Sequence, residues 1–179
     1  RKIPVPQKGV RPTSERVREA VMSILGNDWS GRRVLDCFAG SGAMGFEALS
    51  RGAQHVHFVD SSAAVCRHLS KVSELLKVET LVKVQKANAA EALNSLAARG
   101  QHFDILFFDP PYGQQLLDTV LEHAQNLITS TSVVVAEHEP EYAIADTFGC
   151  LQRTQTRGYG SSVISLFETV HNTETSQCR

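Results

Sequence analysis

The chain alternates short apolar runs with longer stretches in which apolar residues recur every three or four positions. Five runs are rich in Val, Ile, Leu and Phe, as buried parallel strands are. They read RVLDCF from position 33, HVHFVD from 55, LVKVQK from 81, FDILFF from 103 and SVVVAE from 132. Segments 63–78 and 116–128 have the spacing of amphipathic helices. This alternation predicts an α/β fold around a mostly parallel sheet.

The two ends of the chain follow other patterns. TSERVREAVMSIL predicts an amphipathic helix capped near Thr13 or Ser14. Residues 151–168 read as two strands joined by a Gly-rich turn, which predicts an antiparallel hairpin at the sheet edge. No repeat or linker interrupts the sequence. We therefore predict one domain over residues 1–168, with a basic N-terminal segment and helix over 1–30 and a polar tail over 169–179.

Charge is distributed unevenly along the 179 residues. Residues 1–33 hold eight Lys or Arg against three Asp or Glu, a balance of +5, whereas the remainder holds ten against sixteen, a balance of −6. The basic segment indicates an anionic partner, with a solvated face as the alternative. Apolar runs are too short to span a membrane and no secretory signal is present, so we expect a soluble cytoplasmic protein.

Metal binding is not indicated by the sequence. The four cysteines lie far apart without a C-x-x-C pair, so we expect reduced thiols and no zinc site. Glu137-His138-Glu139 has possible ligands, but no second cluster has matching spacing. We interpret this tripeptide as a surface turn.

A glycine loop follows the first predicted strand. Gly40, Gly42 and Gly45 form a literal G-x-G-x-x-G that opens a helix, the context in which this motif binds a nucleotide-like ligand. Asp60 ends the second strand at the distance expected for a carboxylate that binds ribose hydroxyls. The alternative is a plain strand-to-helix turn.

Asp36, just before the loop, favours one class of ligand over another. A carboxylate there would repel a pyrophosphate but attract the ammonium group of S-adenosylmethionine, although Asp36 could also merely cap the loop. Asn88, after the third strand, could bind the adenine edge or cap a helix. An NAD-dependent oxidoreductase therefore ranks last among the functions considered.

The fourth strand ends in Asp109-Pro110-Pro111-Tyr112. In a doubly wound sheet the ends of the first and fourth strands flank one crevice, so this segment is expected to meet the glycine loop. The Asp109 carboxylate and the Pro110 carbonyl could accept the hydrogens of an exocyclic nucleobase amine, held rigidly by the prolines. Tyr112 could stack on an unstacked base. A strand terminator with a buried tyrosine is the alternative.

Three stretches resemble the bacterial 16S ribosomal RNA guanine-N2 methyltransferases: RKIPVP followed by RPTSERVREAV, then LDCFAGSGAMGFEALSRGA, then FDILFFDPPY. YGSSVISLF resembles that family's closing strands, so the resemblance extends to about Glu168. It implies a seven-stranded, doubly wound class I methyltransferase fold, S-adenosylmethionine as donor, and a guanine 2-amino group in small-subunit ribosomal RNA as acceptor, within a ribosomal assembly.

The candidate residues follow from the motifs and the resemblance together. The catalytic candidates are Asp109, Pro110, Pro111 and Tyr112. The cofactor candidates are Asp36, Phe38, Gly40, Ser41, Gly42, Gly45, Asp60 and Asn88. The RNA-binding candidates are Lys2, Lys8, Arg11, Thr13, Arg16 and Arg18, of which Arg16 or Arg18 could instead pair with Glu15 or Glu19.

The sequence departs from the family pattern at three positions. Asp60 stands where the family usually has Glu, Asn88 where it has Asp, and Val72 where it has Asn. The family also has a strand hairpin before RKIPVP. Two other functions stay open: a DNA adenine-N6 methyltransferase, because the same motif serves any exocyclic amine, and a noncatalytic RNA-binding scaffold.

Overall fold

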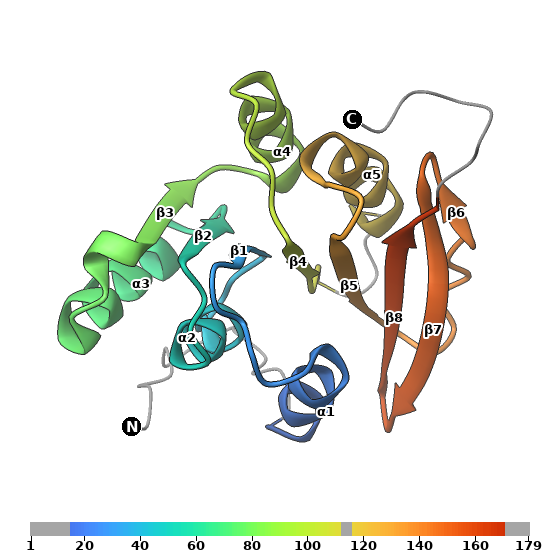
Figure 1. Ribbon diagram of the computed structural model, residues 1–179, viewed down its shortest axis with the longest axis horizontal. Helices are drawn as coiled ribbons and strands as arrows, with labels where there is room; N and C mark the ends of the chain where they lie inside the picture. Colours follow the sequence, from blue (N-terminus) through green and yellow to red (C-terminus); the bar gives the residue numbers. More distant parts are fainter. Residues whose placement is uncertain (1–14, 112–115, 171–179) are drawn as a thin grey trace. The chain divides into compact units, whose positions relative to one another are not determined.

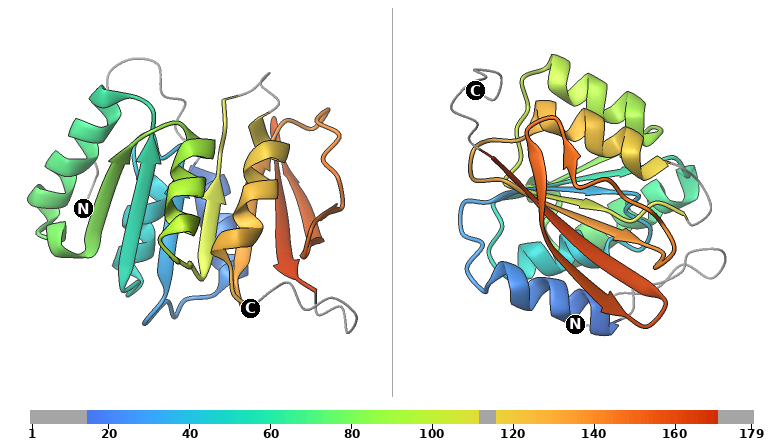
Figure 2. Two further views of the ribbon diagram at one scale, coloured as in Figure 1. Left: turned by 90° about the horizontal axis from the view of Figure 1, so that it is seen from above. Right: turned by 90° about the vertical axis from the view of Figure 1, so that its right-hand side faces the viewer.

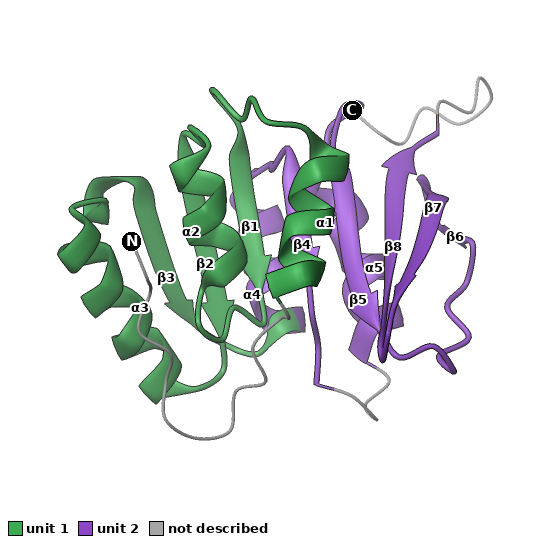
Figure 3. Ribbon diagram, turned by 90° about the horizontal axis from the view of Figure 1, so that it is seen from below, with its two compact units in different colours: residues 1–89 green, residues 90–179 purple. Residues whose placement is uncertain are grey.

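Helices and strands alternate along the chain as the hydrophobic pattern predicts (Figure 1). The computed structural model describes residues 15–111 and 116–170. The chain divides into unit 1, residues 1–89, and unit 2, residues 90–179 (Figure 3). A single domain over residues 1–168 stays a prediction.

Unit 1 is built on three parallel strands in the order β3-β2-β1. Its described elements are α1 (Glu15–Leu25), β1 (Arg33–Cys37), α2 (Ala43–Ser50), β2 (His55–Asp60), α3 (Ala63–Leu76), the short 3-10 helix η1 (Glu79–Leu81) and β3 (Val82–Lys86). Val34 lies opposite Val56, which lies opposite Val82. The register aligns the carboxyl ends of β1 and β2, where the glycine loop and Asp60 lie.

The helix α2 packs closely against β2 because it has a glycine at the contact. A Cβ atom at Gly45 would collide with the Phe58 ring and approach Val56. The rings of Phe46 and Phe58 lie 4.9 Å apart between centroids. Phe46 of α2, Phe58 of β2 and Leu69 of α3 are all buried, so the two helices pack with β2 in the core of unit 1.

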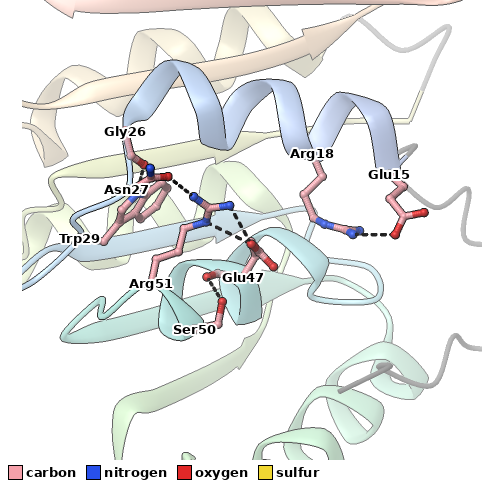
Figure 4. Close-up of polar contacts among 8 residues, drawn as sticks. All are labelled: Glu15, Arg18, Gly26, Asn27, Trp29, Glu47, Ser50 and Arg51. Carbon is pink, nitrogen blue, oxygen red and sulfur yellow. Dashed lines mark hydrogen bonds and ion pairs between the residues drawn. The ribbon is translucent and has the colours of Figure 1, made fainter.

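The turn between α1 and β1 is tied to the end of α2 (Figure 4). Arg51 contacts the Glu47 carboxylate at 3.0 Å and donates to the Asn27 side chain at 2.9 Å. The indole of buried Trp29 donates to the Gly26 carbonyl at 2.8 Å. These bonds fix the chain where it enters β1.

Unit 2 combines parallel and antiparallel strands in the order β4-β5-β8-β7-β6. Its elements are α4 (Ala89–Ala98), β4 (Ile105–Phe108), α5 (Leu116–Ala124), the 3-10 helix η2 (Gln125–Leu127), β5 (Val133–His138), β6 (Thr147–Phe148), β7 (Leu151–Tyr159) and β8 (Ser162–Thr169). β4 pairs with β5 in parallel, whereas the strands after β5 pair antiparallel.

The predicted C-terminal hairpin is confirmed as β7 and β8, a long twisted ribbon (Figure 2). The two-residue strand β6 brings the strand number among the described residues to eight, one more than predicted. β8 supplies the buried Phe167, whose ring meets Phe148 edge to face at 5.7 Å. The hairpin is therefore packed into the core of unit 2 along β8.

One sequence prediction, on the cysteines, is wrong in part. Cys37 and Cys66 are free thiols, but Cys150 is disulfide-bonded, so the prediction of reduced thiols is wrong at that position. Within the described part of the chain, no helix is both long and apolar enough to cross a membrane.

Candidate active site

The loop that leaves β1 requires residues with left-handed backbone conformations. Phe38, Gly40 and Gly42 have φ values of 64°, 51° and 75°. Gly42 is restricted in space as well, because a Cβ atom there would lie 2.5 Å from Leu69 Cδ2 and 2.7 Å from Phe46 Cε2. The Gly42 amide donates to the Ala39 carbonyl at 2.7 Å, which closes a tight turn. Gly40 and Gly42 of the sequence motif are thus requirements of this turn.

Asp36 is buried beneath the loop and caps α2. Its Oδ2 atom accepts a hydrogen bond from the Gly45 amide at 2.9 Å, in the first turn of that helix. A carboxylate at this end of a helix also interacts favourably with the helix dipole. The sequence offered a cap of the loop as an alternative role, and the structure shows Asp36 accepting from the helix that follows the loop. Binding of a ligand ammonium group stays a prediction.

Asp60 is held beside the glycine loop by two backbone amides. Its Oδ2 atom accepts from the Gly40 amide at 3.1 Å, and its Oδ1 atom accepts from the Ser62 amide at 2.8 Å. The Ser62 hydroxyl in turn accepts from the Val65 amide and caps α3. The structure therefore brings together two predicted cofactor residues, Asp60 and Gly40, in a fixed geometry.

Ser62 was missed by sequence reasoning, although Ser before a helical pattern is a recognisable capping signal. Two nearby thiols, Cys37 and Cys66, have raised pKa values. Burial, and then the charge of Asp36, raise the pKa of Cys37, while burial and then Asp60 raise the pKa of Cys66. Both stay protonated at neutral pH.

The other cofactor candidates of unit 1 differ in exposure. Ser41 is buried within the loop and Phe38 is half-buried at its start. Asn88 is exposed and directly precedes α4, in the position of a helix cap. Contact of these residues with a ligand stays a prediction.

The catalytic candidates follow β4 in unit 2. All four residues of β4 are buried. Asp109 is half-buried, Pro110 is buried and Pro111 is exposed, so the segment emerges from the core over three residues. Tyr112 lies outside the described residues. The expected meeting of this segment with the glycine loop stays a prediction.

Glu137 and His138, at the end of β5, differ from their predicted setting. Both are buried, so the interpretation of this stretch as a surface turn is wrong. The His138 Nε2 atom lies 2.9 Å from the Ser165 hydroxyl, and Nδ1 lies 2.9 Å from the Glu139 carbonyl. Burial lowers the pKa of His138. The pairing of β5 with β8, 27 residues away, covers this ring.

The basic N-terminal candidates are only partly described. Lys2, Lys8, Arg11 and Thr13 lie outside the described residues. Arg16 is exposed on α1, and Arg18 lies 3.6 Å from the Glu15 carboxylate. Arg18 thus forms the intrahelical pair that the sequence offered as an alternative to RNA contact. Such an exposed pair contributes little to stability.

Over residues 15–111 and 116–170, no group of three or more His, Cys, Asp or Glu side chains is arranged to hold a metal ion.

Known proteins resemble the chain over most of its length. The family model described as conserved hypothetical protein 95 matches residues 1–168. The putative rRNA methyltransferase YlbH of Bacillus subtilis is 33% identical over 160 residues, which cover 88% of this chain and 87% of that protein. The ribosomal RNA small subunit methyltransferase D of Escherichia coli is 36% identical over 144 residues, covering 79% and 71%.

Solved structures share the fold. The putative methyltransferase yhhF from Escherichia coli has a TM-score of 0.80 at 31% identity, covering 96% of this chain and 93% of that chain. An S-adenosylmethionine-dependent methyltransferase from Agrobacterium tumefaciens has a TM-score of 0.68 at 18% identity, covering 89% and 63%. The predicted methyltransferase-type α/β fold is confirmed. The chain belongs to the conserved hypothetical protein 95 family and is a relative of small-subunit ribosomal RNA methyltransferases.

Proposed function

We propose that this chain transfers a methyl group from S-adenosylmethionine to the exocyclic 2-amino group of a guanine in small-subunit ribosomal RNA. The observation that carries the proposal is the Asp60 carboxylate, held at the glycine loop by the Gly40 and Ser62 amides. The relatives' names supply the reaction and the class of RNA. The guanine amine rests on the sequence resemblance. A ribosomal substrate implies that the protein acts in the cytoplasm.

The described residues of unit 1 fit an adenosine-containing cofactor. A side chain at Gly42 would have no room, so the backbone itself lines the turn. Asp60 would accept hydrogen bonds from both ribose hydroxyls, and Asp36 would attract the ammonium group. When bound, S-adenosylmethionine supplies an electrophilic methyl group on a sulfonium.

Asp109 and Pro110 would prepare the acceptor nitrogen. An exocyclic amine is a poor nucleophile because its lone pair is delocalised into the ring. Hydrogen bonds from the amine to the Asp109 carboxylate and the Pro110 carbonyl would favour a pyramidal nitrogen with a localised lone pair, and would strengthen as positive charge develops there. Tyr112 would stack on the target base.

The test measures methyl transfer to three acceptors side by side: assembled small ribosomal subunits, naked 16S ribosomal RNA and duplex DNA. Nucleoside mass spectrometry should find N2-methylguanine in the ribosomal RNA. Asp109→Ala should lower turnover about 100-fold or more while retaining cofactor affinity. Asp60→Ala should weaken S-adenosylmethionine binding by about 1–3 kcal/mol in calorimetry.

Glu122→Ala provides the matched control, because Glu122 is an exposed acid on α5. It should leave turnover and cofactor affinity unchanged. Adenine methylation of the DNA would contradict the proposal and indicate a DNA adenine-N6 methyltransferase. Absence of methyl transfer to all three acceptors, with RNA binding retained, would favour the noncatalytic scaffold.

A further inference from the structure

The turn between β7 and β8 lies at the same edge of the unit 2 sheet as the Asp109 segment. β8 runs antiparallel to β5 and β7 antiparallel to β8, so β7 ends where β4 and β5 end. Figure 3 shows the ends of β4 and β5 and the β7–β8 turn at the bottom of unit 2. We call residues 157–161 the hairpin tip.

The strand register shows how this edge is aligned. Phe108, the last residue of β4, lies in one row with Ala136, Ser165 and Thr156. Arg157 is the next residue of β7 after Thr156, just as Asp109 is the next residue after Phe108. β4 and β7 are three strand spacings apart, a distance of about 14 Å. A nucleic acid strand that presents a base to Asp109 would reach the hairpin tip within a few nucleotides.

The side chains of the hairpin tip are of the types that proteins use to bind single-stranded RNA. Arg157 is exposed, and its guanidinium has no ion pair or side-chain hydrogen bond with any described residue. Tyr159 is partly exposed and lies two residues further, so strand alternation places both side chains on one face of the hairpin. An arginine beside an aromatic ring can bind a phosphate and stack on a base.

Two glycines flank Tyr159, and both lie in open space. A Cβ atom at Gly158 or at Gly160 would have no neighbour within 4 Å. Gly160 has a φ of 65°, so the turn itself requires a glycine there.

The hairpin is anchored to the end of β5. The Ser165 hydroxyl on β8 lies 2.9 Å from His138 Nε2 and 3.4 Å from the Thr156 hydroxyl on β7. Ile164 and Phe167 of β8 are buried. The hairpin tip is therefore held at a set distance from β5, as a contact that fixes the position of a substrate must be.

We infer that the hairpin tip binds the RNA strand next to the target nucleotide, with Arg157 on a phosphate and Tyr159 stacked on a neighbouring base. This inference rests on the proposed function, because it assigns the substrate that the Asp109 segment would take. The hairpin tip is distinct in sequence from the basic segment over residues 1–30. It would select single-stranded RNA near the target, since a stacked duplex offers no free base face.

Arg157→Ala is tested against Arg153→Ala. Arg153 lies on the same strand but is already paired with Asp146. Arg157→Ala should raise the KM for naked 16S ribosomal RNA about fivefold to tenfold with kcat and cofactor affinity unchanged. It should also lower the slope of log affinity against log salt by about 0.7 for a single-stranded RNA oligonucleotide. Arg153→Ala should change neither quantity.

Tyr159→Ala should weaken binding of the same oligonucleotide about tenfold, whereas Tyr159→Phe should bind within about twofold of the unchanged chain, because stacking needs only the ring. Equal effects of Arg157→Ala and Arg153→Ala, or none, would overturn the inference. A loss seen with assembled subunits but not with naked RNA would assign the contact to a ribosomal protein instead. The binding measurements stand even if no acceptor is methylated, which separates this inference from the proposed reaction.

Discussion

Gly42 is constrained by backbone conformation and by space at once. Its φ of 75° is disfavoured for any residue with a Cβ, and the position of that Cβ is occupied by Leu69 and Phe46, both buried. The sequence motif identifies the glycine. Only the packing of α3 against the start of α2 explains why no larger residue fits.

Gly42→Ala can be compared with Gly31→Ala, because Gly31 has a φ of 76° with no atom within 4 Å of its would-be Cβ. Gly31→Ala should lower the free energy of unfolding by about 1–2 kcal/mol through backbone strain alone. Gly42→Ala should lower the free energy of unfolding by about 1–3 kcal/mol more than Gly31→Ala does, because the new Cβ collides with Leu69 and Phe46. Denaturant unfolding measures both variants. Equal losses in the two variants would contradict the role assigned to Leu69 and Phe46.

At the scale of elements, α2 depends on a residue of the preceding strand. The helix has eight residues, one of them glycine, and its N-cap residue Gly42 offers no capping side chain. Asp36 supplies the cap from β1 through its bond to the Gly45 amide. The same carboxylate therefore stabilises the helix and is predicted to attract the ammonium group of the ligand.

Asp36→Asn and Asp36→Ala separate these two roles. Asp36→Ala should lower the free energy of unfolding by about 1–3 kcal/mol, because the buried Gly45 amide loses its acceptor. Asp36→Asn retains an acceptor oxygen and should lose less stability, but should weaken S-adenosylmethionine binding because the charge is gone. If the Asp36→Asn variant binds S-adenosylmethionine with unchanged affinity in calorimetry, Asp36 has only the capping role.

At the scale of the whole molecule, buried His57 makes stability depend on pH. Burial, as the largest cause, lowers the pKa of His57 to about 4, although its hydrogen bond to Gln85 at 2.9 Å opposes the shift. The positive charges of His55, Lys83 and Arg33 add to the lowering. Below the ordinary value of 6.5 the unfolded chain binds a proton that the folded chain does not, so stability falls as pH falls from 6.5 to about 4.

His57→Gln should flatten this dependence by up to about 1.4 kcal/mol per pH unit between pH 6.5 and about 4. The measurement is denaturant unfolding at a series of pH values, with His102→Gln as control because His102 is exposed. A His57→Gln variant with the slope of the unchanged chain would contradict the lowered pKa.

Local patterns in the sequence determined most elements of this protein. The period of apolar residues located five parallel strands and the intervening helices, the glycine spacing located the loop after β1, and the Gly-rich turn located the β7–β8 hairpin. Each of these signals depends on residues a few positions apart. The family resemblance likewise rests on contiguous stretches, and the comparisons confirm it.

Tertiary structure alone decided the contacts between distant segments. The bond from the Gly40 amide to Asp60 spans 20 residues, and the contact of His138 with Ser165 spans 27. β6 has only two residues, too few to show a period. Glu137 and His138 look like surface residues by composition but are buried once β8 pairs with β5. Strand order and register depend on which apolar faces are covered together, and a local pattern does not contain that information.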